Sequence, residues 1–298
     1  MQVNTHQTFH PQIRATDDTI SAKFDLTWEE AARLANQHTL SVQRFLSTRS
    51  PHAKVFEQNG VTGCLSRIKA PFLNLSLDAY YPPELEEQAV LTEIEALRTF
   101  YETHQMNHCW LWLISPFATP DNLPSLLFEQ GFKSNEYHLP CLMTSLKDTS
   151  DWPRIPDNVT IWPACDLDDL KIATHIRRTA FRQTGDAAIS YFEDTADSWL
   201  SNDNVRLFLG GVNPDKIPAA IGLLIIANDI PGIYVMATLP EWEHNGLGRA
   251  IIARILQEAI DQGYDKAVLT AGARAYSLYQ KFGFQHLFEY QMFIAGEA

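Results

Sequence analysis

The sequence predicts an α/β protein built from two similar units, and three observations carry this prediction. Residues 233–284 read as a strand, a glycine turn, a long helix, a second strand and a short helix. The same order of elements occurs in the first half, between Pro83 and Gly131, and both copies end on a Gly-Phe pair. A polar, proline-containing segment at residues 149–158 separates the halves. Such a repeated order of elements indicates a duplicated fold.

Length and composition fit two compact units. With 298 residues and a hydrophobic content of 45%, the chain can bury two cores. We expect an N-terminal unit at residues 1–148, a linker at residues 149–158 and a C-terminal unit at residues 159–298. Prolines and polar residues in the linker are typical of a segment outside regular structure.

Composition and charge exclude several classes of partner. No run of about twenty apolar residues occurs, and the N-terminus lacks the basic and then apolar order of a secretory signal, so we expect a cytoplasmic protein without a membrane partner. With 23 basic and 36 acidic residues the net charge is −13, which repels nucleic acids. The four cysteines and ten histidines lack the spacing of metal-binding motifs, so we expect no metal site.

The first half shows clear local patterns. Residues 26–46 carry apolar side chains at helical spacing, with Thr27 in position to cap the helix and a break expected near His38. Asn59 and Gly60 stand between two short apolar runs, which is a strong hairpin signal. The other expected elements are a tail or first strand at 1–24, a strand at 72–81, a helix at 84–104, a strand at 109–114 and a short helix at 124–130.

The second half continues the alternation of strands and helices. A helix over residues 166–181 has an acidic start and a basic end, which both favour its dipole. Asn228 and Asp229 form the expected turn into the central strand at 233–239. The remaining expected elements are strands at 159–163, 205–212, 217–227 and 285–294, and a helix at 190–200.

Gly246 and Gly248 lie in the turn between the central strand and a helix that starts at Leu247. A helix start leaves backbone N–H groups unpaired, and the helix dipole adds about half a positive charge there. Glycine lets a phosphate approach the backbone without meeting a Cβ. The turn therefore predicts an anion site, although a plain flexible helix start shows the same pattern.

The whole stretch resembles the acetyl-CoA-binding core of the GNAT N-acetyltransferase superfamily. That core has a strand ending in V-x-P, a [RQ]-x-x-G-x-[GA] loop, a long helix, a strand and then A-x-x-L-Y-x-K-x-G-F. The matching positions here are Thr238-Leu239-Pro240, then Glu243 to Gly248, then Ala275, Leu278, Tyr279, Lys281, Gly283 and Phe284. The resemblance implies two units, each a mixed, mostly antiparallel twisted sheet flanked by helices, with acetyl-CoA as co-substrate.

The resemblance also implies roles for individual residues. Backbone groups of Met236, Ala237 and Thr238 would pair with the pantetheine arm like an added strand. Tyr279 would protonate the departing CoA thiolate, because a phenol with a pKa of about 10 keeps its proton at neutral pH. The pyrophosphate would be held by backbone amides of His244, Asn245, Gly246, Leu247, Gly248 and Arg249.

Two positions depart from the family pattern. Glu243 replaces the usual Arg or Gln, and a carboxylate about 4 Å from a pyrophosphate costs on the order of 1 kcal/mol in water. Gly272 replaces an Asn that often contacts the pantetheine arm. The base that takes the proton of the amine stays open between Glu241, Tyr234 and a chain of water molecules.

The first copy lacks the residues that this chemistry needs. Glu84, Glu86 and Glu87 stand where the phosphate loop would be, and Leu127 occupies the place of the tyrosine. We therefore interpret the N-terminal unit as a degenerate acetyltransferase-like domain that packs on the second unit. An unrelated α/β domain is the alternative interpretation.

The expected reaction is acetyl transfer from acetyl-CoA to a primary amine by direct attack in a ternary complex. The alternative is a non-catalytic acyl-CoA-binding or regulatory module, which Glu243 and Gly272 would suit. A dinucleotide-binding oxidoreductase is disfavoured, because Ile251 stands where its third glycine would be and Asp265 is a poor ribose ligand. The sequence identifies neither the acceptor, a small molecule or a peptide, nor the oligomeric state.

Overall fold

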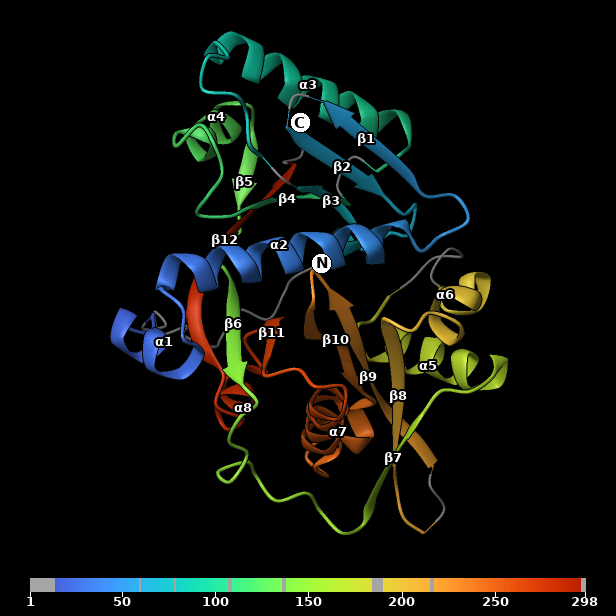
Figure 1. The fold of residues 1–298 in the computed structure, drawn as a ribbon. Helices are drawn as coiled ribbons and strands as arrows, with labels where there is room; N and C mark the ends of the chain where they lie inside the picture. Colours follow the sequence, from blue (N-terminus) through green and yellow to red (C-terminus); the bar gives the residue numbers. More distant parts are fainter. Residues whose placement is uncertain are drawn as a thin grey trace.

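The structure is a computed structural model that describes residues 14–58, 60–77, 79–106, 109–135, 138–183, 190–214 and 217–295. Within these ranges one sheet of twelve strands runs through the molecule in the order β1-β2-β3-β4-β12-β6-β11-β10-β9-β8-β7, with β5 beside β12 (Figure 1). The strands are β1 Lys54–Gln58, β2 Val61–Leu65, β3 Asn74–Leu77, β4 Leu111–Ile114, β5 Phe132–Ser134, β6 Leu139–Ser145, β7 Val159–Pro163, β8 Val205–Val212, β9 Ile217–Ala227, β10 Ile230–Thr238, β11 Lys266–Thr270 and β12 Gln285–Ala295.

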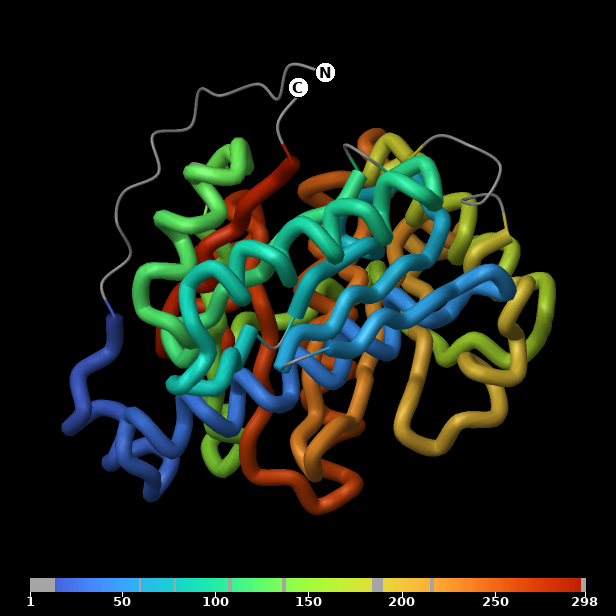
Figure 2. The backbone as a smooth tube through the Cα atoms, turned by 90° about the horizontal axis from the view of Figure 1, so that it is seen from above, coloured from blue at the N-terminus to red at the C-terminus, as the bar shows by residue number. Residues whose placement is uncertain are grey.

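Helices cover both halves of this sheet. The α-helices are α1 Asp17–Phe24, α2 Trp28–Thr48, α3 Glu87–Thr103, α4 Leu123–Glu129, α5 Leu167–Ala180, α6 Asp197–Leu200, α7 Leu247–Asp261 and α8 Tyr276–Gln280, with short 3₁₀ turns at Pro71–Leu73, Glu193–Thr195 and Pro240–Trp242. The apolar face of α3 packs over β1 and β2, as seen from above in Figure 2. Among the described residues, no helix combines the length and the apolarity that crossing a bilayer requires.

The two halves exchange strands. In β12, the first part (Gln285 to Tyr290) pairs with β6, and the second part (Gln291 to Ile294) pairs with β4 of the N-terminal half. In return β6, from the N-terminal half, lies between β11 and β12. Each half therefore completes the sheet of the other. The division of the chain at residues 149–158 stays a prediction.

Helix α2 lies across the middle of the molecule, between the two parts of the sheet (Figure 1). It begins with a capping box, in which Thr27 and Glu30 satisfy each other's backbone N–H groups. The helix continues through His38 without the expected break, because the His38 ring packs against Gly232 and bonds to the Ala227 carbonyl instead of disturbing the helix.

Several boundaries differ from those that the sequence predicts. Residues 17–24 form a helix and not a tail or strand, because Thr16 caps its first turn while Ile20 and Phe24 are buried. The helix expected at 84–104 begins only at Glu87, four residues after the last proline of the preceding pair. The helix expected at 190–200 is reduced to a 3₁₀ turn and a single α-helical turn. The antiparallel pairing of β1 and β2 confirms the hairpin expected there, while Asn59 itself lies outside the described residues.

Candidate functional site

Strands β10 and β11 are parallel but meet at one point. Gly232 and Val268 are their one pair of Cα partners among the described residues. Further along, β10 has a bulge between Tyr234 and Ala237, and Val235 takes a φ of 49°. A bulge turns a strand away from its neighbour. The edge of β10 that faces β11 is therefore left without a strand partner at the residues that follow the bulge, which are Met236, Ala237 and Thr238.

The loop between β10 and α7 presents a series of unpaired donors. Gly246 is the N-cap of α7 with a φ of 81°, and His244 also has a positive φ, of 65°. Among the described residues, no acceptor bonds to the backbone N–H groups from His244 to Arg249. Such a set of free amides at a helix start is an anion-binding arrangement. The loop residues singled out from the sequence, His244 to Arg249, are thus brought together at one point.

An arginine lies close to the acid at the head of this loop. Arg274 Nη2 is 2.9 Å from Oε1 and 2.8 Å from Oε2 of Glu243. The ion pair offsets part of the negative charge of the carboxylate that was expected to repel a pyrophosphate, within the limit set by the exposure of the Arg274 side chain. The two residues are 31 positions apart, so nothing in the local sequence pattern indicated the pair.

The linker packs against the outer side of the same loop. A Cβ on Gly246 would lie 2.5 Å from Pro156 Cγ, and Arg249 Nη1 donates to the Arg154 carbonyl oxygen at 3.0 Å. A Cβ on Gly248, in contrast, would meet only Leu278 Cδ2, at 3.8 Å. Gly246 is therefore required by the free protein itself, whereas Gly248 leaves open space above its backbone.

Tyr279 lies on α8, the short helix that follows β11. Leu278 of the same helix faces the start of α7, which places α8 beside the loop. The Tyr279 side chain is 4% exposed and packs edge-on against Phe284, with ring centroids 5.8 Å apart. Burial raises the pKa of the Tyr279 phenol well above its usual value near 10. The hydroxyl therefore stays protonated throughout the neutral range.

The two side chains considered as the base for the amine proton differ in their exposure to solvent. Glu241 is exposed in the 3₁₀ turn after β10. Tyr234 is buried on β10, and burial raises the pKa of its phenol far above the usual value. A phenol in that state is a poor proton acceptor at neutral pH.

The fold also brings a residue to β10 that sequence reasoning missed. His38 of α2 is fully buried, and its ring stacks on Tyr234 at a centroid distance of 5.7 Å. Its Nδ1 lies 3.0 Å from the Ala227 carbonyl oxygen. Burial lowers the pKa of His38 to about 4, so the imidazole is neutral at pH 7. A histidine spaced by more than 190 residues from this strand gives no local sequence signal.

The corresponding place in the N-terminal half is closed. Thr119 bonds on both sides of Tyr80: its N–H donates to the Ala79 carbonyl at 2.8 Å, and its own carbonyl accepts from the Tyr81 N–H at 3.2 Å. These bonds occupy the main-chain groups that follow β3. Leu127, in the place of the tyrosine, is fully buried. The edge that is free in β10 is therefore paired in the N-terminal half.

Two further features concern ligands. A Cβ on Gly272 would meet no atom within 4 Å, so this position has room for a side chain. Within the described ranges, no three His, Cys, Asp or Glu side chains gather closely enough to hold a metal ion.

Comparisons with known proteins agree with this geometry. Residues 171–284 match the family model described as "Acetyltransferase (GNAT) family". A GCN5-related N-acetyltransferase from Kribbella flavida is similar in structure, with a TM-score of 0.65 and 20% identity over 88% of this chain and 96% of that one. A tandem GNAT protein from the clavulanic acid biosynthesis pathway superposes with a TM-score of 0.59 and 12% identity, over 93% of this chain and 97% of its own. Among curated protein sequences, none matches this chain.

These likenesses extend over both halves of the chain. The structural neighbours cover the N-terminal half as well as the matched residues, and one of them is described as tandem. The prediction of two units, each with a mixed sheet flanked by helices, is confirmed.

Proposed function

We propose that this protein acetylates a primary amine, since residues 171–284 match the model of the GNAT acetyltransferase family and acetyl transfer from acetyl-CoA is the general activity of that family. The acceptor would be a small molecule or a peptide. The observation that carries the proposal is the combination of a free strand edge on β10 with a row of unpaired amides at the start of α7. An extended thioester with a diphosphate at its far end is complementary to both.

Binding of acetyl-CoA would use main-chain groups. The pantetheine arm pairs with the edge of β10 at Met236, Ala237 and Thr238, in the manner of an added strand. The pyrophosphate accepts hydrogen bonds from the amides between His244 and Arg249, which have no other partner among the described residues. Because Glu243 is paired with Arg274, its charge opposes this binding less than the sequence suggested.

The transfer itself balances as follows. The amine nitrogen attacks the thioester carbonyl carbon, a C–N bond forms, and the C–S bond then breaks. The CoA sulfur takes a proton from the Tyr279 hydroxyl and leaves as the thiol. The amine nitrogen loses one proton to solvent, and the Tyr279 phenolate takes a proton back from solvent, which restores the hydroxyl. Tyr279 is available as the proton donor because its raised pKa keeps the hydroxyl protonated at neutral pH, and because α8 lies beside the loop. Holding the two reactants together supplies much of the rate.

The N-terminal unit has a supporting part in this proposal. Its own strand edge is occupied by Thr119, which opposes the binding of a second thioester. It provides β6, which completes the sheet beside β11, and α2, whose His38 packs against the point where β10 and β11 separate.

A non-catalytic acyl-CoA-binding module is the second candidate. Gly272 favours it, since the absent side chain removes one contact to the pantetheine arm. A turnover assay separates the two candidates: acetyl-CoA is incubated with the protein and a panel of amines, amino acids and peptides, and released thiol is measured. Amine-dependent thiol release supports the enzyme, whereas saturable binding of acetyl-CoA without thiol release from any amine supports the binding module.

A further inference from the structure

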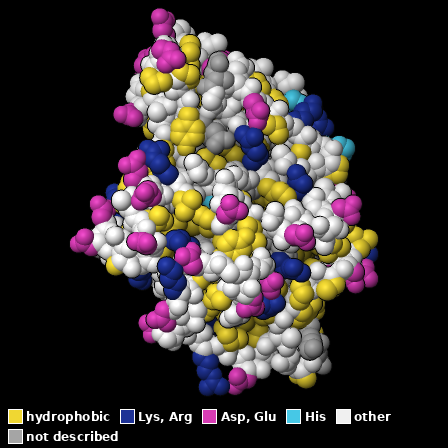
Figure 3. All heavy atoms as spheres, in the orientation of Figure 1, with side chains coloured by type: hydrophobic (Ala, Val, Ile, Leu, Met, Phe, Trp, Pro, Cys, Tyr) yellow, Lys and Arg dark blue, Asp and Glu magenta, His cyan; other side chains and the backbone are white. Residues whose placement is uncertain are grey.

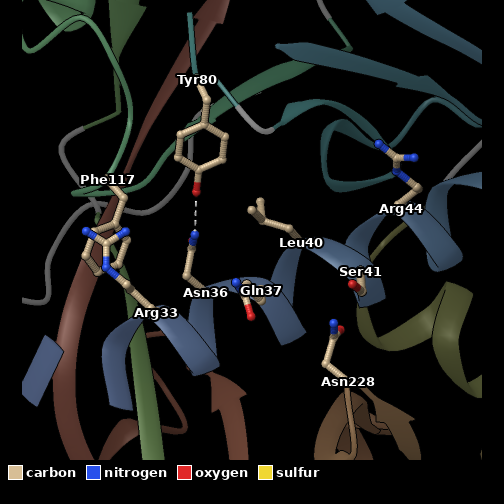
Figure 4. A pocket seen from close by; sticks show the side chains of 9 residues that line it. All are labelled: Arg33, Asn36, Gln37, Leu40, Ser41, Arg44, Tyr80, Phe117 and Asn228. Carbon is tan, nitrogen blue, oxygen red and sulfur yellow. Dashed lines mark hydrogen bonds between the residues drawn. The ribbon is translucent and has the colours of Figure 1, made fainter. Parts of the chain in front are cut away.

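A cavity of about 480 Å³ lies between α2, the segment after β3 and the hairpin that joins β9 to β10 (Figure 4). It is separate from the free edge of β10. One face of α2 forms its floor, through side chains that recur at helical spacing from Arg33 to Arg44. Tyr80 and Phe117 come from the N-terminal unit, and Asn228 from the hairpin. We call this cavity the α2 groove.

The α2 groove is cationic in an acidic protein. The chain carries a net charge of −13, and acidic side chains are spread over the molecular face in Figure 3. Among the described residues that line the groove, however, two are arginines and none is Asp or Glu. Arg33 and Arg44 are eleven residues apart on α2, which separates their backbones by about 16 Å. A positive lining of this length favours an anion.

Both guanidinium groups have partners that a ligand can replace. Arg33 pairs with Glu29 at 2.9 Å, and Arg44 pairs with Glu57 at 2.8 Å and also donates to the Thr62 hydroxyl at 2.8 Å. All four side chains are more than 40% exposed in these pairs, and exposed ion pairs contribute little. An anion within the cavity would be less solvated and would bind the same guanidinium groups more strongly.

Two aromatic rings give the groove a flat apolar part. The Arg33 guanidinium lies 4.5 Å from the centre of the Phe117 ring, which holds both groups in place. The Tyr80 side chain is 39% exposed, and its hydroxyl accepts from Asn36 Nδ2 at 2.7 Å. Asn36 is itself fixed by the Tyr290 hydroxyl, which donates to its Oδ1 at 2.8 Å. The two rings are therefore held at defined positions on one side of the groove.

We propose that the α2 groove binds a small organic anion that joins a carboxylate or phosphate group to a flat ring. The anionic group bonds to the guanidinium of Arg33 or Arg44, and the ring packs against Phe117 and Tyr80. This site is separate from the free edge of β10 and from the loop at Gly246. Its existence does not depend on acetyl transfer.

Isothermal titration of the full-length protein with phenyl phosphate and with benzoate tests the proposal, and benzylamine and benzyl alcohol are the charge controls. We expect the two anions to bind and the two controls to bind at least tenfold more weakly. Equal binding of all four ligands, or no binding of either anion up to about 10 mM, overturns the proposal.

Three variants locate the binding. Arg33→Gln and Ser41→Asp should each weaken anion binding about tenfold or more, the first by removing a charge and the second by adding an opposing one within the lining. Arg14→Gln is the matched control, because Arg14 stacks on Trp28 outside the groove. Unchanged anion affinity in both groove variants overturns the assignment. Acetyl-CoA affinity, measured on the same samples, should stay constant, which keeps this test separate from that of the proposed activity.

Discussion

Arg274 Nη2 lies 2.8 Å from Glu243 Oε2, at the head of the loop that precedes α7. The Arg274 guanidinium offsets part of the negative charge that Glu243 places near the loop. Replacement of Arg274 by Ala should therefore weaken acetyl-CoA binding about fivefold, because one unpaired charge near a pyrophosphate costs on the order of 1 kcal/mol in water-like surroundings. Titration calorimetry at low salt measures this.

The double variant Arg274→Ala with Glu243→Gln provides the control, since it removes both charges. Its affinity should return to near the starting value, and the loss in the single variant should shrink in 1 M salt, where the screening length is about 3 Å. An equal loss in both variants would show that Arg274 contacts the ligand directly.

The two glycines of the loop should respond differently to alanine. Gly246→Ala forces a side chain into a left-handed conformation and against Pro156, so it should lower the free energy of unfolding by roughly 1–2 kcal/mol or more. Gly248→Ala meets no atom closer than 3.8 Å and should leave the stability nearly unchanged. If a phosphate approaches this backbone, Gly248→Ala will still weaken acetyl-CoA binding. Urea unfolding and calorimetry on both variants separate these effects.

Tyr279→Phe should reduce kcat about a hundredfold while acetyl-CoA affinity changes little, because the hydroxyl is needed only when the thiolate leaves. Burial raises the pKa of Tyr279, so its proton is lost only above about pH 10. Below about pH 10, loss of the Tyr279 proton should therefore cause no decline in the reaction rate. Tyr276→Phe, on the same helix, is the matched control. Equal kcat values for Tyr279→Phe and the unaltered protein would remove Tyr279 from the mechanism.

His38 should make stability depend on pH. Its pKa is about 4 in the folded protein against about 6.5 when unfolded, so the unfolded chain binds more protons between these values. The stabilisation is complete above pH 6.5 and is lost as the pH falls towards 4, by roughly 3 kcal/mol. Urea unfolding of His38→Phe should show a weaker pH dependence over this interval than the unaltered protein. His52→Gln, at an exposed position, should show the same dependence as the unaltered protein.

The strand exchange predicts that the halves depend on each other. Residues 159–298 alone lack β6, which leaves β11 and β12 with unpaired edges in the middle of a sheet. Such edges promote aggregation. The separate C-terminal half should therefore be aggregated or poorly folded by circular dichroism and size-exclusion chromatography, and addition of residues 1–148 should restore folding. A monomeric, cooperatively folding C-terminal half would contradict this expectation.

The local features of the fold could be predicted from the sequence. The periodicity of α7, the hairpin pairing of β1 with β2 and the cap at Thr27 depend on neighbours within a few residues, and the structure confirms them. The helix expected at 190–200 is longer than the observed helix at Asp197–Leu200. The rings of Tyr191 and Phe192 pack against Trp199 and do not follow one face of a continuous helix.

The pairing of strands from different halves of the chain could not be predicted from the sequence. The strand patterns of β6 and β12 show that they are strands, but their partners lie in the other half of the chain. Two other contacts depend on the complete fold in the same way. Thr119 pairs with the main-chain groups that follow β3, and His38 contacts Gly232. The residues proposed to bind acetyl-CoA were nevertheless found from the sequence, since β10, the loop and α7 are contiguous.

The central claim is that the free edge of β10 and the amides at the start of α7 bind acetyl-CoA. Calorimetric titration of the 298-residue chain with acetyl-CoA measures this binding. We expect saturable binding at one site, with a dissociation constant below about 1 mM, and a weaker affinity for Gly248→Ala. Absence of saturable binding at millimolar acetyl-CoA, or equal affinity in the unaltered protein and in Gly248→Ala, would contradict it.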